Sequence, residues 1–155
     1  MIRSFRRFFR RNFCSAGKAE LLELLDEDVG VRSAIIQDET SPLARTRVSY
    51  RWRQFADHCS FTIHETDLRR KSEQTILDRE LPEGEFLAVL REIENAGGAS
   101  LGNFYGEILD GVFYTISWGT AGRVTNLDVK NPQAGSPRHE ELIRKLKVHA
   151  RAARG

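Results

Sequence analysis

The side chains best suited to nucleophilic chemistry in this sequence are those of Asp57, His58 and Cys59, which stand next to one another. A thiol becomes a good nucleophile when a neighbouring imidazole accepts its proton. The segment alternates apolar and polar residues as a strand does, so His58 and Cys59 are expected to point to opposite faces. Cys59 then shares its face with Phe61 and Ile63. This arrangement favours a buried, unreactive thiol over a catalytic one.

Metal binding by His58, His64 and Glu65 is a second chemistry that these residue types allow. Their spacing matches none of the usual metal-ligand patterns, and we expect His64 on the solvated face of its strand. The sequence also has no CxxC pair, HExxH helix, Walker-type glycine loop or GxSxG elbow. We therefore expect no enzyme activity, no catalytic residue, no metal site and no cofactor. A metal site, or a hydrolase or transferase that uses these histidines or Cys59, is the less favoured alternative.

Four arginines form the most suggestive binding feature, because they recur on one side of a strand predicted in RTRVSYRWR. Strand residues two apart share a face and lie about 6.6 Å from each other. Their guanidinium groups would form a comb that can bind phosphates or carboxylates in bidentate fashion. The alternative is an ordinary solvated face, on which Asp78 and Glu80 of a neighbouring strand pair with the comb. The comb consists of Arg45, Arg47, Arg51 and Arg53.

Two aromatic residues are further candidates for binding a protein partner. Phe113 shares the polar face of its predicted strand with Thr115 and Ser117, and Tyr105 is expected on the same side of a hairpin. An exposed aromatic among small polar residues is typical of an interaction hot spot. The alternative is that the N-terminal segment covers Phe113. Both tryptophans alternate with polar residues in their strands and are expected in the core.

The first 19 residues carry six basic residues and no acidic one, whereas residues 20–39 carry seven acidic residues and one arginine. At about 100° per residue, a helix would place the arginines opposite a phenylalanine-rich face. Such a segment can lie in a membrane interface, bind a partner or nucleic acid through charge, remain disordered or be processed, or fold back on the acidic block. We favour folding back. The candidates for a membrane or anionic surface are Arg3, Phe5, Arg6, Arg7, Phe8, Phe9, Arg10 and Arg11.

The elements expected to position these residues alternate between strands and helices. Asp110-Gly111 predicts a hairpin, and two prolines suit the first turns of helices. The order is βββα twice, which predicts an α+β fold with a mostly antiparallel sheet and helices on one face, preceded by an N-terminal amphipathic helical segment. Helices are predicted over 18–30, from Pro82 and from Pro137, and strands over 45–55, 59–65, 73–81, 103–109, 112–118 and 123–130.

A chain of 155 residues suits one domain. We divide it into a basic, then acidic, helical segment over 1–30 and a single α+β domain over 31–155, with a pseudo-repeat of 45–97 and 103–153. Two cysteines are too few for a disulfide scaffold, and no apolar run is long enough to span a bilayer. Arginines also interrupt the opening segment, which is unlike a secretory signal. We therefore expect a cytoplasmic protein.

The segment DGVFYTISWGTAGRVTNLDVKNP, followed by a basic-ended helix, resembles the layout of small bacterial proteins, some of which are immunity proteins that neutralise a toxin. The resemblance covers about residues 104–150 and concerns layout, so it carries over no site residue. It implies a non-enzymatic protein-binding module, an immunity or inhibitor protein that blocks a toxin. The alternative is a peripheral membrane-binding or, less favoured, nucleic-acid-binding protein that uses the N-terminal helix. A homodimer formed through an open sheet edge is a further option.

Overall fold

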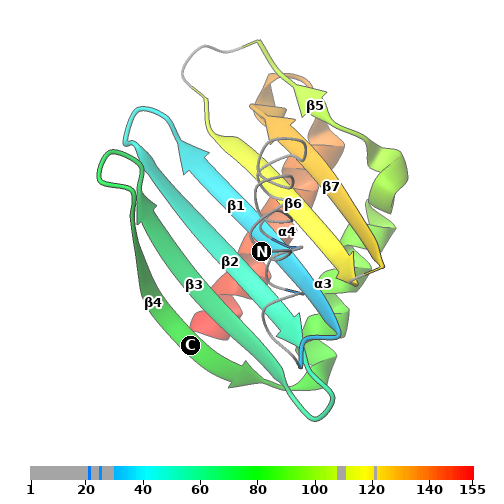
Figure 1. Ribbon diagram of the computed structural model, residues 1–155. Coiled ribbons are helices and arrows are strands. Elements are labelled where there is room, and N and C mark those ends of the chain that lie inside the picture. Colours follow the sequence, from blue (N-terminus) through cyan, green and yellow to red (C-terminus); the bar gives the residue numbers. More distant parts are fainter. Residues whose placement is uncertain (1–20, 22–24, 26–29, 108–110, 121) are drawn as a thin grey trace.

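The computed structural model describes residues 21, 25, 30–107, 111–120 and 122–155, and within these ranges the strands form one seven-stranded sheet (Figure 1). The strands are β1 (Ser33–Ser41), β2 (Thr46–Gln54), β3 (Cys59–Asp67), β4 (Ser72–Leu81), β5 (Phe104–Tyr105), β6 (Phe113–Thr120) and β7 (Arg123–Lys130). The helices are α3 (Glu83–Asn95) and α4 (Pro137–Arg154), with 3-10 turns η1 (Gly98–Leu101) and η2 (Pro132–Ala134).

The strand order is β4-β3-β2-β1-β6-β7-β5, and all neighbours are antiparallel except β5 and β7. Strands β1 to β4 follow one another as a meander, which needs only short turns. The second half of the chain returns to the other edge of β1, where β6 pairs with it. The prediction of an α+β fold with a mostly antiparallel sheet is thus confirmed.

Both helices cover one face of the sheet (Figure 1). Strand alternation turns Trp52 and Phe61 toward the helices, and their ring centroids lie 5.1 Å apart. Phe86 of α3 and Leu146 of α4 pack against this layer and are buried. Burial of such large apolar side chains stabilises the fold by roughly 1.5–3 kcal/mol each. The core therefore lies between the helices and the sheet.

We call the opposite side of the sheet the polar face. On β1 it carries Ala34 and Ile36, which are buried together with Leu21 and Leu25. Because alternate residues of a strand point to opposite faces, Ile35 lies on the helix side. Strand β1 is therefore covered on both faces, and these two leucines, together with Gly30, are the described part of the segment predicted over 1–30. The remainder of that prediction lies outside the described residues.

Two predictions of local structure are wrong. Strand β1 was not predicted, so four strands, and not three, precede α3 within the described residues. The hairpin predicted over 103–118 is also absent among the described residues, because β5 is two residues long and pairs in parallel with β7. The division at residue 30 and the pseudo-repeat remain predictions.

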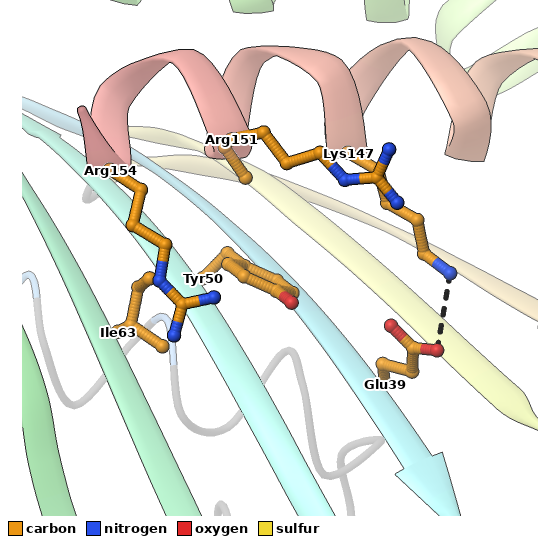
Figure 2. A pocket seen from close by; sticks show the side chains of 7 residues that line it. Glu39, Tyr50, Ile63, Lys147, Arg151 and Arg154 are labelled. Carbon is orange, nitrogen blue, oxygen red and sulfur yellow. Dashed lines mark hydrogen bonds and ion pairs between the residues drawn. The ribbon is translucent and has the colours of Figure 1, made fainter.

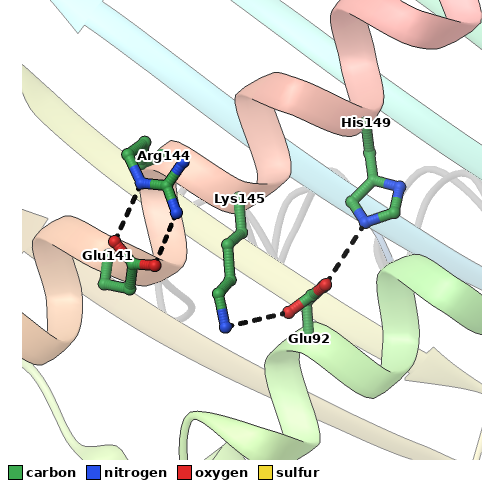
Figure 3. Close-up of polar contacts among 5 residues, drawn as sticks. All are labelled: Glu92, Glu141, Arg144, Lys145 and His149. Atoms are coloured by element: carbon green, nitrogen blue, oxygen red, sulfur yellow. Dashed lines mark hydrogen bonds and ion pairs between the residues drawn. The ribbon is translucent and has the colours of Figure 1, made fainter.

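Polar contacts join α3 to α4 and link two residues within α4 (Figure 3). Lys145 of α4 donates to Glu92 of α3 at 3.4 Å, and His149 Nε2 lies 3.5 Å from the other carboxylate oxygen of Glu92. Within α4, both nitrogens of the Arg144 fork donate to Glu141, at 2.8 and 2.6 Å. The exposed Arg144–Glu141 pair contributes little to stability, whereas Glu92 and His149 are half-buried. In the described ranges, no helix is long and apolar enough to cross a membrane.

Candidate functional site

Three of the four comb arginines lie on the polar face of β2 as predicted. Arg53 is directly opposite Ala34, and Arg51 is opposite Ile36, so both share the face of these β1 residues. Arg47 follows on the same side, nearer the start of the strand. The period-two pattern therefore located this surface correctly.

Arg45 corrects the prediction, because it lies in the turn before β2 and not in the strand. Its φ of 52° is in the left-handed region, so the alternation of side chains does not extend to it. The residue is exposed. It belongs to the end of the sheet and not to the comb.

Arg51 is held within the polar face, and only 14% of its side chain is exposed. Its Nη2 donates to Glu73 of β4 at 3.2 Å, and its Nε donates to Ser49. His64 Nδ1 lies 3.0 Å from the same oxygen of Glu73. Two basic groups of adjacent strands thus meet one carboxylate.

Arg53 is also engaged, since its Nε donates to Ser60 Oγ at 3.0 Å. The carboxylates predicted to neutralise the comb, Asp78 and Glu80, form no ion pair with any described residue. Glu73 takes that place instead. A bulge between Ile63 and its neighbour shifts the register of β3 and β4, which strand alternation alone does not reveal.

A row of five side-by-side residues crosses the polar face from β5 to β2. Its members are paired across consecutive strands, and we call it the lateral row: Tyr105, Lys130, Phe113, Thr40 and Arg47. Adjacent strands lie about 4.8 Å apart, so the row is roughly 19 Å long. It joins residues that were predicted as two separate groups, Arg47 on one hand and Tyr105 with Phe113 on the other. Lys130 and Thr40 were not predicted.

Two contacts within the lateral row each join a pair of its side chains, and both aromatic rings remain accessible. Lys130 Nζ lies 4.6 Å from the centroid of the Phe113 ring, a cation–π contact. Arg47 Nε donates to Thr40 Oγ1 at 3.3 Å. Tyr105 is 60% exposed and Phe113 38%. The row thus offers aromatic surface and positive charge to a partner.

Two neighbouring turns extend this surface at one end of the sheet (Figure 1). The Leu68 N–H donates to the Arg45 carbonyl at 2.9 Å, so the β1–β2 and β3–β4 turns touch. Leu43, at the tip of the first turn, is 75% exposed. Asp67 accepts two backbone N–H bonds in the second turn, and these bonds hold the pKa of its carboxyl below the usual value. The exposed cations of the turns are Arg45, Arg69, Arg70 and Lys71.

Cys59 is buried, as predicted, with 1% of its surface exposed. Burial, together with the nearby charge of Glu83, raises the pKa of its thiol. His58 Nδ1 lies 2.7 Å from Asp57 Oδ1, and the imidazole stacks on Phe55 with ring centroids 4.4 Å apart. The imidazole is thus engaged away from the thiol.

His64 lies on the polar face, but only 16% of its side chain is exposed, so the prediction of a solvated histidine is wrong. Its neighbour Glu65 occupies the next position of β3 and therefore points to the other face. In the part of the chain that the structure describes, no group of three or more His, Cys, Asp or Glu side chains could hold a metal ion.

The residues predicted for a membrane or anionic surface, within 3–11, lie outside the described residues. No family model matches this sequence, and no curated protein matches it either.

Proposed function

We propose that this protein is a non-enzymatic protein-binding module of the immunity or inhibitor kind, which binds its partner through the lateral row. The observation that carries the proposal is the row itself: two exposed aromatic rings and two cations placed side by side across five strands. Blocking a toxin is the role that the resemblance of residues 104–150 implies for such a surface.

The composition of the lateral row resembles that of protein-binding hot spots, in which aromatic residues and arginine dominate. Phe113 is the central anchor, because it lies in the middle of the row between Lys130, whose ammonium contacts its ring, and Thr40, its pairing partner on β1. An anchor that is already ordered loses little conformational entropy on binding. Its truncation should therefore weaken binding strongly.

Positive charge at the turns indicates what kind of partner fits. Four exposed cations lie in the two turns at the end of the sheet beside the row, and exposed Leu43 lies in one of these turns. Charges at the rim of an interface mainly accelerate association with a surface of opposite sign. We therefore expect an acidic partner surface with an apolar centre, and an association rate that falls as salt increases.

Arg51 and Arg53 have a supporting role in this proposal. Arg51 already binds Glu73, and Arg53 binds Ser60. These bonds tie β2 to β3 and β4, so the two arginines hold the sheet on which Arg47 is presented. Their replacement should lower stability more than partner affinity.

The test is to capture the partner with the full-length protein and measure its affinity for single variants. Phe113→Ala should weaken binding about thirtyfold, which corresponds to about 2 kcal/mol, and Arg47→Ala about tenfold. Leu87→Ala is the matched control, since Leu87 on α3 has the same exposed fraction of 38%. Equal affinities of the Phe113→Ala, Arg47→Ala and control variants would contradict the proposal, as would capture of lipid or nucleic acid in place of a protein.

A further inference from the structure

A pocket of about 290 Å³ lies on the other side of the sheet, between the C-terminal half of α4 and strands β1 to β3 (Figure 2). Lys147 and Arg154 extend from α4 toward the sheet on either side of Tyr50 (Figure 2). Ile63 and Ala150 provide buried apolar surface. The lining residues are Glu39, Tyr50, Ile63, Lys147, Ala150, Arg151 and Arg154.

The pocket carries an excess of two positive charges. Lys147 Nζ donates to Glu39 Oε1 at 3.2 Å and to the Tyr114 hydroxyl at 3.3 Å, so one cation and one carboxylate neutralise each other. Arg151 and Arg154 have no acidic partner among the described residues, and both are exposed. Cations near the end of a helix also stabilise its dipole. That effect explains their presence on α4 but not a pocket that they share with Tyr50.

Tyr50 brings a hydroxyl group into the field of these cations. Burial raises the pKa of Tyr50, and so does the charge of Glu39, whereas Lys147, Arg154 and Arg151 lower it. The hydroxyl is therefore protonated at neutral pH and can donate a hydrogen bond. All three basic side chains lie close enough to influence the same oxygen.

We infer that this pocket binds a small organic phosphate monoester in its dianionic form. A phosphate monoester carries nearly two negative charges at pH 7, which matches the excess charge of the pocket. The planar guanidinium groups of Arg151 and Arg154 suit bidentate contact with phosphate oxygens, and the Tyr50 hydroxyl adds a third donor. The half-buried ring of Tyr50 offers apolar surface to the organic part, and the buried side chains of Ile63 and Ala150 complete the lining. This inference is independent of the lateral row.

Phenyl phosphate is a suitable probe, because it combines a dianion with a small apolar ring. Titration calorimetry of the full-length protein at pH 7.5 and 0.15 M salt should detect binding of phenyl phosphate, weaker binding of inorganic phosphate and none of phenol. The double variant Arg151→Gln/Arg154→Gln should bind phenyl phosphate at least tenfold more weakly. Arg144→Gln is the matched control, since it removes one charge of the same helix outside the pocket.

Two further measurements separate the phosphate site from an unspecific basic surface. Tyr50→Phe, which removes one oxygen only, should weaken phenyl phosphate binding several-fold without changing the melting temperature by more than a few degrees. Lowering the pH from 7.5 to 5 should weaken binding, because the monoester loses one charge with a pKa of about 6. Benzoate binding as tight as that of phenyl phosphate would overturn the assignment of ligand class. Unchanged binding by the double variant, or no binding at millimolar phenyl phosphate, would overturn the site.

Discussion

Cys59 illustrates, at the scale of a residue, how its neighbours determine the chemistry of a reactive group. The thiolate is the form that reacts, and burial raises the pKa of this thiol. In a Cys14→Ser background, we expect Cys59 to react with an aromatic disulfide reagent at pH 8 about a hundredfold more slowly in the native protein than in urea. The release of the chromophore measures both rates. Equal rates would show an accessible thiol and would favour the hydrolase or transferase alternative.

The sequence could predict only those candidate-site residues that follow the alternation of side chains along a single strand. Arg47 was found because it alternates with apolar residues of its own strand, and Phe113 because the same alternation places it on one face with Thr115 and Ser117. Lys130 and Thr40 join them through pairing with other strands, a relation that no local pattern contains. Arg45 was placed in the comb because the pattern was continued into a turn, where a positive φ ends it.

At the scale of elements, β1 was missed because it is buried on both faces. Five consecutive residues from Ala34 to Asp38 are buried, so the strand has no alternation of apolar and polar residues. Two of these buried residues, Gln37 and Asp38, are polar, so in sequence the segment resembles a linker. Strands covered on both sides typically lose the period of two. Strands β2 and β3 were predicted because their polar face carries polar side chains.

The hairpin signal at Asp110-Gly111 failed for a different reason. Gly111 does not adopt a positive φ among the described backbone angles. A Cβ at this position would lie 1.1 Å from Asn131 Oδ1, so the absence of a side chain lets Asn131 approach. The glycine serves close packing near the ends of β6 and β7, and β5 is free to pair in parallel with β7.

Gly119 is a second glycine at a close approach, and its replacement tests whether that approach is needed for the β6–β7 hairpin. Its φ is 142°, and a Cβ would lie 1.9 Å from the carbonyl oxygen of Arg123 on the partner strand. Because backbone strain and overpacking each cost about 1–3 kcal/mol, Gly119→Ala should lower the free energy of unfolding by about 3 kcal/mol. Urea denaturation measures the change.

The matched control for this variant lies in the same hairpin. A Cβ on Gly122 would have no atom within 4 Å, so Gly122→Ala should change the free energy of unfolding by less than about 0.5 kcal/mol. If both variants were equally stable, the close approach at Gly119 would not govern the hairpin.

At the scale of the whole molecule, the class of fold was predictable and the order of strands was not. The two prolines located the starts of α3 and α4, and the apolar stripes of these helices predicted that both cover one face. The position of β1 between β2 and β6 joins the two halves of the chain into one sheet. That arrangement depends on contacts between residues far apart in sequence, such as Ile36 and Ser117.

The docking of α4 on the sheet makes the stability of the whole molecule sensitive to alkaline pH. Burial lowers the pKa of Lys147, but Glu39 and Tyr114 outweigh it, so the pKa lies above the ordinary value of 10.5. A group whose pKa is higher in the folded state adds stability below its unfolded pKa and loses it as the pH rises through the folded value. Burial raises the pKa of Tyr50 above 10.0 as well, so the unfolded chain loses this proton first. Both groups therefore destabilise the protein from about pH 10 upward.

We expect the free energy of unfolding in urea to change little between pH 8 and 9.5 and to fall at higher pH. The double variant Tyr50→Phe/Lys147→Met should be less stable at pH 8, where the Lys147–Glu39 pair is lost, yet its stability should fall less steeply above pH 10. Lys145→Met is the control, because Lys145 pairs with Glu92 at the exposed side of the helices and should leave the slope unchanged. If the free energy of unfolding fell equally steeply with pH in the wild-type protein and the double variant, Tyr50 and Lys147 would not be the groups that make the docking of α4 sensitive to pH. If stability fell less steeply above pH 10 in the double variant but not in the Lys145→Met control, the alkaline loss of stability would belong to the contact between α4 and the sheet.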